Sequence, residues 1–209
     1  MVRRILWGRA TSSNVMKVIW LLEELGLAYE RVDVGGDFGR TDTAEYRAMN
    51  PTSLVPTLQE DSFTLWESNA ILRYLCEAHA PDHPFWPRET RRRANIDRWM
   101  DAQQTLLNRP MSVVFWGLVR TPAEQRDPVA ITSAIADTAR VWELVSAELS
   151  RHPYIAGDAL TLADFPWGPH LHRWMTMRFD RPEIAHLRAW YERLLERPAF
   201  RNHLAGPVS

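Results

Sequence analysis

Two polar residues, Glu67 and Ser68, stand directly before an apolar stretch that has the spacing of a helix. The start of a helix leaves backbone N–H groups without partners and carries about half a positive charge, so it readily binds a carboxylate. Residues of these two types are also common as helix caps, a role that needs no ligand. The two residues taken alone therefore leave two interpretations open, a carboxylate-binding site and a simple cap.

A second polar segment, residues 11–14, precedes another helical stretch and consists of Thr11, Ser12, Ser13 and Asn14. Apolar residues follow it at the i, i+3, i+4, i+7 spacing of one helix face, namely Val15, Val18, Ile19 and Leu22. Asn14 is the expected N-cap, and Gly26 is expected to close the helix in a left-handed conformation. Hydroxyl and N–H donors at such a helix start suit a nearby negative charge, although they also serve as ordinary caps.

The first 78 residues alternate between strand-like and helix-like segments. Strands are expected on either side of the first helix and in a later hairpin, at 4–7, 29–34, 56–59 and 62–65. A strand–helix–strand unit with a crossover of this length is parallel and right-handed. The order βαβ followed by ββα predicts an α/β thioredoxin-like N-terminal domain over residues 1–78.

The second half of the chain has a different pattern. Residues 79–87 contain three prolines, which exclude a regular helix, so we predict an interdomain linker over 79–88. Beyond it the sequence predicts helices and no strand, at 91–107, 128–149, 161–177 and 184–195. We therefore predict an all-α helical C-terminal domain over residues 89–209.

The composition is that of an ordinary globular protein, with 45% hydrophobic and 24% charged residues among 209. A net charge of -1 gives no general attraction for nucleic acid. The single cysteine, Cys76, excludes an intrachain disulfide framework and a multi-thiolate metal site. The sequence shows neither a targeting segment nor a stretch of roughly 20 apolar residues that would span a membrane, so we expect a cytoplasmic protein.

Three segments together resemble cytosolic glutathione transferases, and the resemblance covers nearly the whole chain. They are residues 50–58 (NPTSLVPTL), 65–71 (LWESNAI) and 154–165 (YIAGDALTLADF). Residues 17–27 (KVIWLLEELGL) also look like bacterial members of theta-, nu- or beta-like type. The resemblance implies an enzyme that activates the thiol of glutathione, its co-substrate, for attack on a small hydrophobic electrophile without a metal.

The resemblance also assigns roles in glutathione binding. The Val55–Pro56 peptide bond would be cis, and the backbone of Val55 would pair with the cysteinyl part of glutathione like an added strand. Ser68 would hold the γ-glutamyl carboxylate, and Glu67 would accept the ammonium of the same group. Thr161 and Asp164 match the capping box of the family, which is structural.

The thiol-activating residue is expected in the segment 11–14. By resemblance to theta-, delta-, beta- and nu-like enzymes, Ser12 is the primary donor to the thiolate, Asn14 is its partner and Ser13 is the reserve. The segment has neither a tyrosine, as alpha-, mu- and pi-like enzymes use, nor a cysteine for a mixed disulfide. Cys76 lies in an apolar helical stretch and is expected to be inert.

The second substrate is expected between this segment and the long helices of the second domain. Several aromatic and polar residues are spaced to line that pocket, and we assign substrate contacts to Trp99, Gln103 and Trp116, with Phe38 from the first domain. One residue departs from the family pattern: Leu54 stands where many theta-like relatives carry a lysine. The glycyl carboxylate of glutathione would then need another cation, such as Arg40 or Lys17.

Two other functions remain open. A glutathione-dependent disulfide reductase is compatible with the nu-like match of Ser12 and Asn14. A non-catalytic binding protein with this fold is the second alternative, since a fold does not prove activity. The resemblance also implies a homodimer in which the first domain of each subunit faces the second domain of the other.

Overall fold

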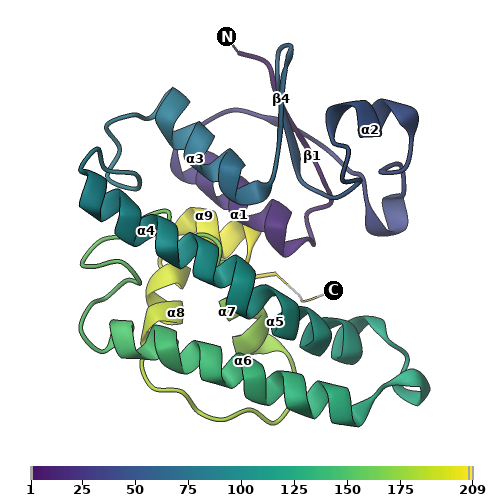
Figure 1. Ribbon diagram of the computed structural model, residues 1–209, viewed down its shortest axis with the longest axis vertical. Helices are drawn as coiled ribbons and strands as arrows, with labels where there is room; N and C mark the ends of the chain where they lie inside the picture. The colour runs from purple at the N-terminus through teal and green to yellow at the C-terminus, as the bar shows by residue number, and fades with distance from the viewer. Residues whose placement is uncertain (1, 207, 209) are drawn as a thin grey trace.

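The computed structural model describes residues 2–206 and 208, and it contains an α/β layer and a helical layer (Figure 1). The sheet has the order β2-β1-β3-β4. Its first two strands are parallel, and the others are antiparallel to their neighbours. The strands are β1 (Arg4–Trp7), β2 (Glu30–Val32), β3 (Thr57–Glu60) and β4 (Phe63–Trp66). This arrangement confirms the thioredoxin-like expectation.

Helix α1 (Ser13–Glu24) forms because its apolar stripe is buried, with Val15, Val18 and Leu22 inaccessible to solvent. Gly26 ends it at φ +62°, and the N–H of Leu27 bonds back to the carbonyl of Leu22, as the sequence predicts. The other helices of this layer are α2 (Ala44–Met49), α3 (Ser68–His79) and the short 3₁₀ turn η1 (Gly36–Phe38).

The prediction that Asn14 is the N-cap of α1 is wrong by two residues. Ser12, and not Asn14, holds the extended backbone of a cap, and its carbonyl accepts from the N–H groups of Val15 and Met16. Asn14 lies inside the first turn of the helix. The physical reason is that the cap is defined by this backbone geometry, which several adjacent polar residues are able to adopt.

The helical layer contains two long helical runs that cross the lower half of Figure 1. The first run, residues 90–120, continues through two wider π-helical turns, η2 and η3. This first run consists of α4 (Thr90–Ala102), η2 (Gln103–Leu107), α5 (Asn108–Phe115) and η3 (Trp116–Arg120). The short turn η4 (Ala123–Gln125) leads to the second run, α6 (Pro128–Leu149). The remaining helices are α7 (Gly168–Thr176), α8 (Leu187–Leu195) and α9 (Pro198–His203). In the described part of the chain, no helix combines the length and apolar character that crossing a membrane requires.

The helix predicted over 161–177 begins only at Gly168. The residues before it are held in successive turns by the buried carboxylate of Asp164. Its two oxygens accept from the N–H groups of Thr161, at 3.0 Å, and Ile155, at 3.1 Å. The expected contact of the capping box is therefore present, but it stabilises turns ahead of the helix.

The two layers share one continuous core, and α1 lies between them. Trp20 of α1 is fully buried, with its ring centroid 4.2 Å from that of Phe165 and 4.9 Å from that of Phe200. A Cβ atom at Gly168 would come within 2.6 Å of the Trp20 ring, so only glycine permits this close approach of α7. Helix α1 therefore carries the segment 11–14 on a rigid support from both domains.

Candidate active site

A cavity of about 500 Å³ lies where the two domains meet. The first domain contributes the segment 9–14, the loop 35–41 and the residues before β3, and the second contributes α5, η3 and α7. Its lining residues are Arg9, Ser12, Ser13, Asn14, Gly35, Gly36, Thr41, Ser53, Leu54, Val55, Asn108, Ser112, Phe115, Trp116 and Arg173. Of the predicted site residues, Ser12, Asn14, Val55 and Trp116 are thus brought together.

The start of α1 offers several hydrogen-bond donors to this cavity. Within the described residues, the hydroxyl of Ser12 makes no hydrogen bond and does not cap the helix. The N–H groups of Ser13 and Asn14, at the open end of the helix, also have no acceptor there. The arrangement can stabilise an anion that enters the cavity beside Ser12.

The Val55–Pro56 peptide bond is cis, as predicted. Neither the N–H nor the carbonyl of Val55 has a hydrogen-bond partner in residues 2–206 and 208, so both are available to a ligand. Gly8 brings the two loops together, because a Cβ atom there would lie 3.4 Å from Cβ of Val55 and 2.5 Å from the Val15 side chain. An extended peptide is therefore able to pair with Val55 next to the start of α1.

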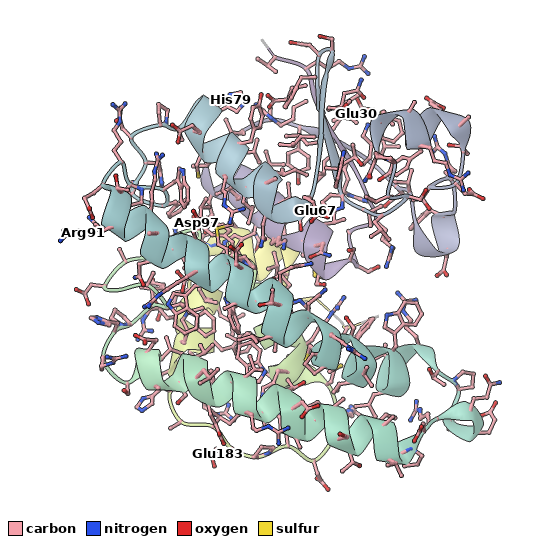
Figure 2. All side chains as sticks on the ribbon, in the orientation of Figure 1. Glu30, Glu67, His79, Arg91, Asp97 and Glu183 are labelled. Atoms are coloured by element: carbon pink, nitrogen blue, oxygen red, sulfur yellow. The ribbon has the colours of Figure 1, made fainter. Side chains whose placement is uncertain are left out.

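Glu67 and Ser68 lie at the start of α3, beside the same turn. The pairing of Thr57 with Trp66 in the hairpin places Pro56 opposite Glu67. Glu67 and His79 mark the two ends of α3 in Figure 2. Glu67 is exposed at φ +69°, a conformation that is uncommon for a residue with a side chain, and it makes no capping bond. Ser68 is 5% exposed, and the two residues lie outside the lining of the cavity, beyond Val55.

Lys17 does not offer a cation to the cavity. Its side chain is 1% exposed, and its Nζ donates to Oδ1 of Asn69 at 2.7 Å. Burial, opposed in part by the charge of Glu67, lowers the pKa of Lys17 to about 7. Arg40 is exposed and lies outside the cavity lining, so neither residue contacts the cavity in place of the missing lysine at Leu54.

The structure does not bring all expected substrate contacts to the cavity. Trp116 and its neighbour Phe115 both line the cavity. Trp116 is 57% exposed, whereas Phe115 is buried. Gln103, in contrast, is fully buried, and the Trp99 ring packs 5.9 Å from that of Trp167. Phe38 is 54% exposed but lies outside the lining. Helical spacing predicts which residues share a face, but it does not say which face meets the cavity.

Sequence reasoning missed Arg173 of α7. Its Nη2 donates to the carbonyl of Thr11 at 2.8 Å, and its guanidinium lies 3.9 Å from the centre of the Phe115 ring. Burial and the charges of Arg9 and Arg120 lower the pKa of Arg173 to about 10. The two bonded residues are 162 positions apart, and no local signal in the sequence points to their contact.

Cys76 is unsuited to thiol chemistry. It is fully buried in α3, and burial raises the pKa of its thiol to about 12. At neutral pH the residue is an uncharged thiol without access to solvent, as its apolar surroundings in the sequence suggest.

A thioredoxin-like domain joined to a helical domain, with unpaired donors at a cis-proline turn and at two helix starts, is the architecture of a glutathione-binding protein. Residues 3–77 match the family model described as "Glutathione S-transferase, N-terminal domain". Residues 125–193 match the one described as "Glutathione S-transferase, C-terminal domain". The chain belongs to the glutathione S-transferase family.

Individual relatives agree with this assignment. The chain is 40% identical over 207 residues to glutathione S-transferase GstB of Escherichia coli, covering 98% of this chain and 99% of that protein. It is 31% identical to glutathione S-transferase 3 of Zea mays, over 96% and 93% of the two chains. Among solved structures, a theta class glutathione S-transferase from Xanthomonas axonopodis pv. citri with glutathione bound matches with a TM-score of 0.96, 41% identity and complete coverage of both chains.

Proposed function

We propose that this protein is a glutathione transferase that binds glutathione along Val55 and ionises its thiol beside Ser12. The observation that carries the proposal is the Ser12 hydroxyl, which has no capping role and faces the cavity that Val55 also lines. The glutathione-bound Xanthomonas relative, at 41% identity, supports the same ligand here. The γ-glutamyl group would extend from Val55 toward the start of α3, where Ser68 meets its carboxylate and Glu67 its ammonium.

The chemical step follows from the donors at the start of α1. A free thiol has a pKa near 8.5 and is only a few per cent ionised at pH 7. The Ser12 hydroxyl, assisted by Asn14 and the unpaired N–H groups, stabilises the thiolate more than the thiol and lowers this pKa. A shift of two units corresponds to about 2.7 kcal/mol. The thiolate then attacks an electrophile held against Trp116.

Parallel assays with glutathione test this function. We expect conjugation of 1-chloro-2,4-dinitrobenzene above the uncatalysed rate and little exchange with bis(2-hydroxyethyl) disulfide. Efficient disulfide exchange without conjugation would favour a reductase, which the loop hydroxyl and Asn14 also support. Glutathione binding without either reaction would identify a non-catalytic binding protein.

We also propose a homodimer in which the first domain of one subunit faces the second domain of the other. Large exposed apolar residues support it, because they occur on the edge strand β4 (Phe63, Trp66) and on the face of the helical layer (Leu106, Val113, Leu144). Light scattering at micromolar concentration is expected to give twice the monomer mass, and the monomer mass would contradict the proposal.

We place the enzyme in the cytoplasm, where glutathione is kept reduced.

A further inference from the structure

The peptide group between Thr11 and Ser12 is held from both domains. Its N–H, which belongs to Ser12, donates to the carbonyl of Arg9 at 3.2 Å. Its carbonyl, which belongs to Thr11, accepts from Nη2 of Arg173 at 2.8 Å and from no other group among the described residues. Because a peptide group is planar, bonds on its two opposite edges fix the direction in which the backbone enters Ser12.

The guanidinium of Arg173 is itself held in place by the helical domain. It lies 3.9 Å from the centre of the Phe115 ring, and both residues are buried, at 8% and 6% exposed. A planar guanidinium stacks on an aromatic ring and presents its N–H groups within its own plane. The donor that reaches the Thr11 carbonyl is therefore preorganised by α5 and α7.

The hydroxyl of Ser12 depends on this backbone for its position. Within the part of the chain that the structure describes, no hydrogen bond orients the hydroxyl. The carbonyl of Ser12 is engaged at 2.9 Å and 2.8 Å by the N–H groups of Val15 and Met16. The place of the hydroxyl in the cavity therefore follows from the backbone, which Arg173 holds on one side. A donor that is displaced by about 1 Å loses most of its effect on a reacting group.

We propose that Arg173 is a positioning residue of the transferase reaction, which aims the Ser12 hydroxyl at the sulfur of glutathione through its bond to the Thr11 carbonyl and so favours ionisation of the thiol. This inference rests on the proposed function, in which Ser12 meets the thiolate. The effect is carried by a hydrogen bond, so it does not depend on how the charges around the guanidinium are compensated. The helical domain would thus take part in activating a thiol that the first domain binds.

A double-mutant cycle with Ser12 tests the proposal in the full-length enzyme. Arg173→Met removes the donors at similar side-chain length. The first measurement is the pKa of bound glutathione, followed by the ultraviolet absorbance of its thiolate without an electrophile. The second is kcat and the KM for glutathione in conjugation of 1-chloro-2,4-dinitrobenzene.

We expect Arg173→Met to raise the pKa of bound glutathione by about 0.5–1 unit, which lowers the thiolate fraction below that pKa about three- to tenfold. The KM for glutathione should change little. In the Ser12→Ala background the same substitution should shift the pKa by less than about 0.2 unit, because the hydroxyl that Arg173 positions is absent. A role in stability alone would appear as an equal loss in urea unfolding in both backgrounds, without this dependence on Ser12.

Two further variants complete the experiment. Arg178→Met is the matched control, because Arg178 is an exposed arginine just beyond the end of α7, and it should keep the parent pKa. Arg173→Lys keeps the positive charge but loses the planar group, so it should raise the pKa by a smaller amount. If Arg173→Met does not fold, Arg173→Lys takes its place in the same cycle.

Three outcomes would overturn the inference. The parent pKa in the Arg173 variants that fold would show that the bond to Thr11 does not position the hydroxyl. An equal rise with and without the Ser12 hydroxyl would mean that Arg173 acts directly on the thiolate. A rise in the KM for glutathione alone would assign Arg173 to binding. These outcomes leave the proposed function intact, whereas a parent enzyme whose bound glutathione keeps the pKa of a free thiol would contradict both.

Discussion

The Nζ of Lys17 in α1 donates a hydrogen bond over 2.7 Å to Oδ1 of Asn69, the second residue of α3. The amide nitrogen of Asn69 in turn donates to the carbonyl of Met100 in α4 at 3.1 Å. One buried set of polar groups thus joins α1 and α3, the two helices of the proposed glutathione site, to each other and to α4 of the helical domain. These bonds hold the helix that follows the proposed thiol position against the helix that begins at the proposed γ-glutamyl position.

Lys17 is the only lysine of the chain, so its ionisation can be followed by NMR after selective labelling of lysine. Burial lowers its pKa to about 7, whereas an unfolded lysine titrates near 10.4. Between pH 7 and pH 10.4 the unfolded state therefore binds more protons than the folded state. The free energy of unfolding rises with pH in this range, by up to about 1.4 kcal/mol per pH unit. Lys17→Met should remove this slope in urea unfolding between pH 7 and pH 8.5. A single resonance titrating above pH 10 would contradict the expectation.

Ser12→Ala should raise the pKa of bound glutathione while changing its affinity little. The loop hydroxyl acts mainly on the charged sulfur, so its loss should cost about 1.5–3 kcal/mol, or ten- to a hundred-fold in rate. The measurement is the pH dependence of conjugation, supported by the ultraviolet absorbance of the thiolate. Ser13→Ala provides the comparison. If Ser13→Ala shows the loss and Ser12→Ala keeps the parent profile, the donor is Ser13.

Ser68→Ala should act on binding first. Ser68 is assigned to the γ-glutamyl carboxylate, which contacts the enzyme equally in the ground state and in the transition state. We expect the KM for glutathione to rise about five- to thirty-fold with little change in kcat. Ser62→Ala in the exposed β3–β4 turn is the matched control. A fall in kcat at unchanged KM would place Ser68 in the chemistry instead.

Asp164→Ala should destabilise the fold without touching the cavity. The substitution leaves the buried N–H groups of Thr161 and Ile155 without their acceptor, which should cost about 2–5 kcal/mol. Urea unfolding measures this loss. The control is Asp158→Ala, whose side chain is 87% exposed and which should change stability by about 0.5 kcal/mol or less. Equal stability of the two variants would refute the structural role of Asp164.

Local signals in the sequence predicted the first domain well. The apolar stripe that begins at Val15, the glycine at position 26 and the hairpin before Glu67 depend on nearby residues, and the structure follows them. The start of α7 could not be predicted in this way. Residues 161–167 have helical spacing, but the carboxylate of Asp164 also holds the distant N–H of Ile155, which keeps this segment in turns.

The cavity wall was less predictable for a related reason. Trp99 and Gln103 are spaced like pocket residues, yet Gln103 is fully buried and the Trp99 ring packs against that of Trp167 in the interior, because their face of the first helical run meets the core and not the cavity. Arg9 and Arg173 carried no motif at all. The two arginines line the same cavity only because α7 packs beside the start of α1, a contact between distant parts of the chain.

The hydrogen bond from Arg173 to the carbonyl of Thr11 has a consequence for how such proteins diversify. The loop that precedes Ser12 is completed by a side chain encoded 162 positions later. A recombination event that joined this first domain to the helical domain of a distant homologue would supply a new substrate pocket and, at the same time, remove a support of the thiol loop. An exchanged helical domain would keep this support of the thiol loop only if it carried an arginine at the position of Arg173 in α7.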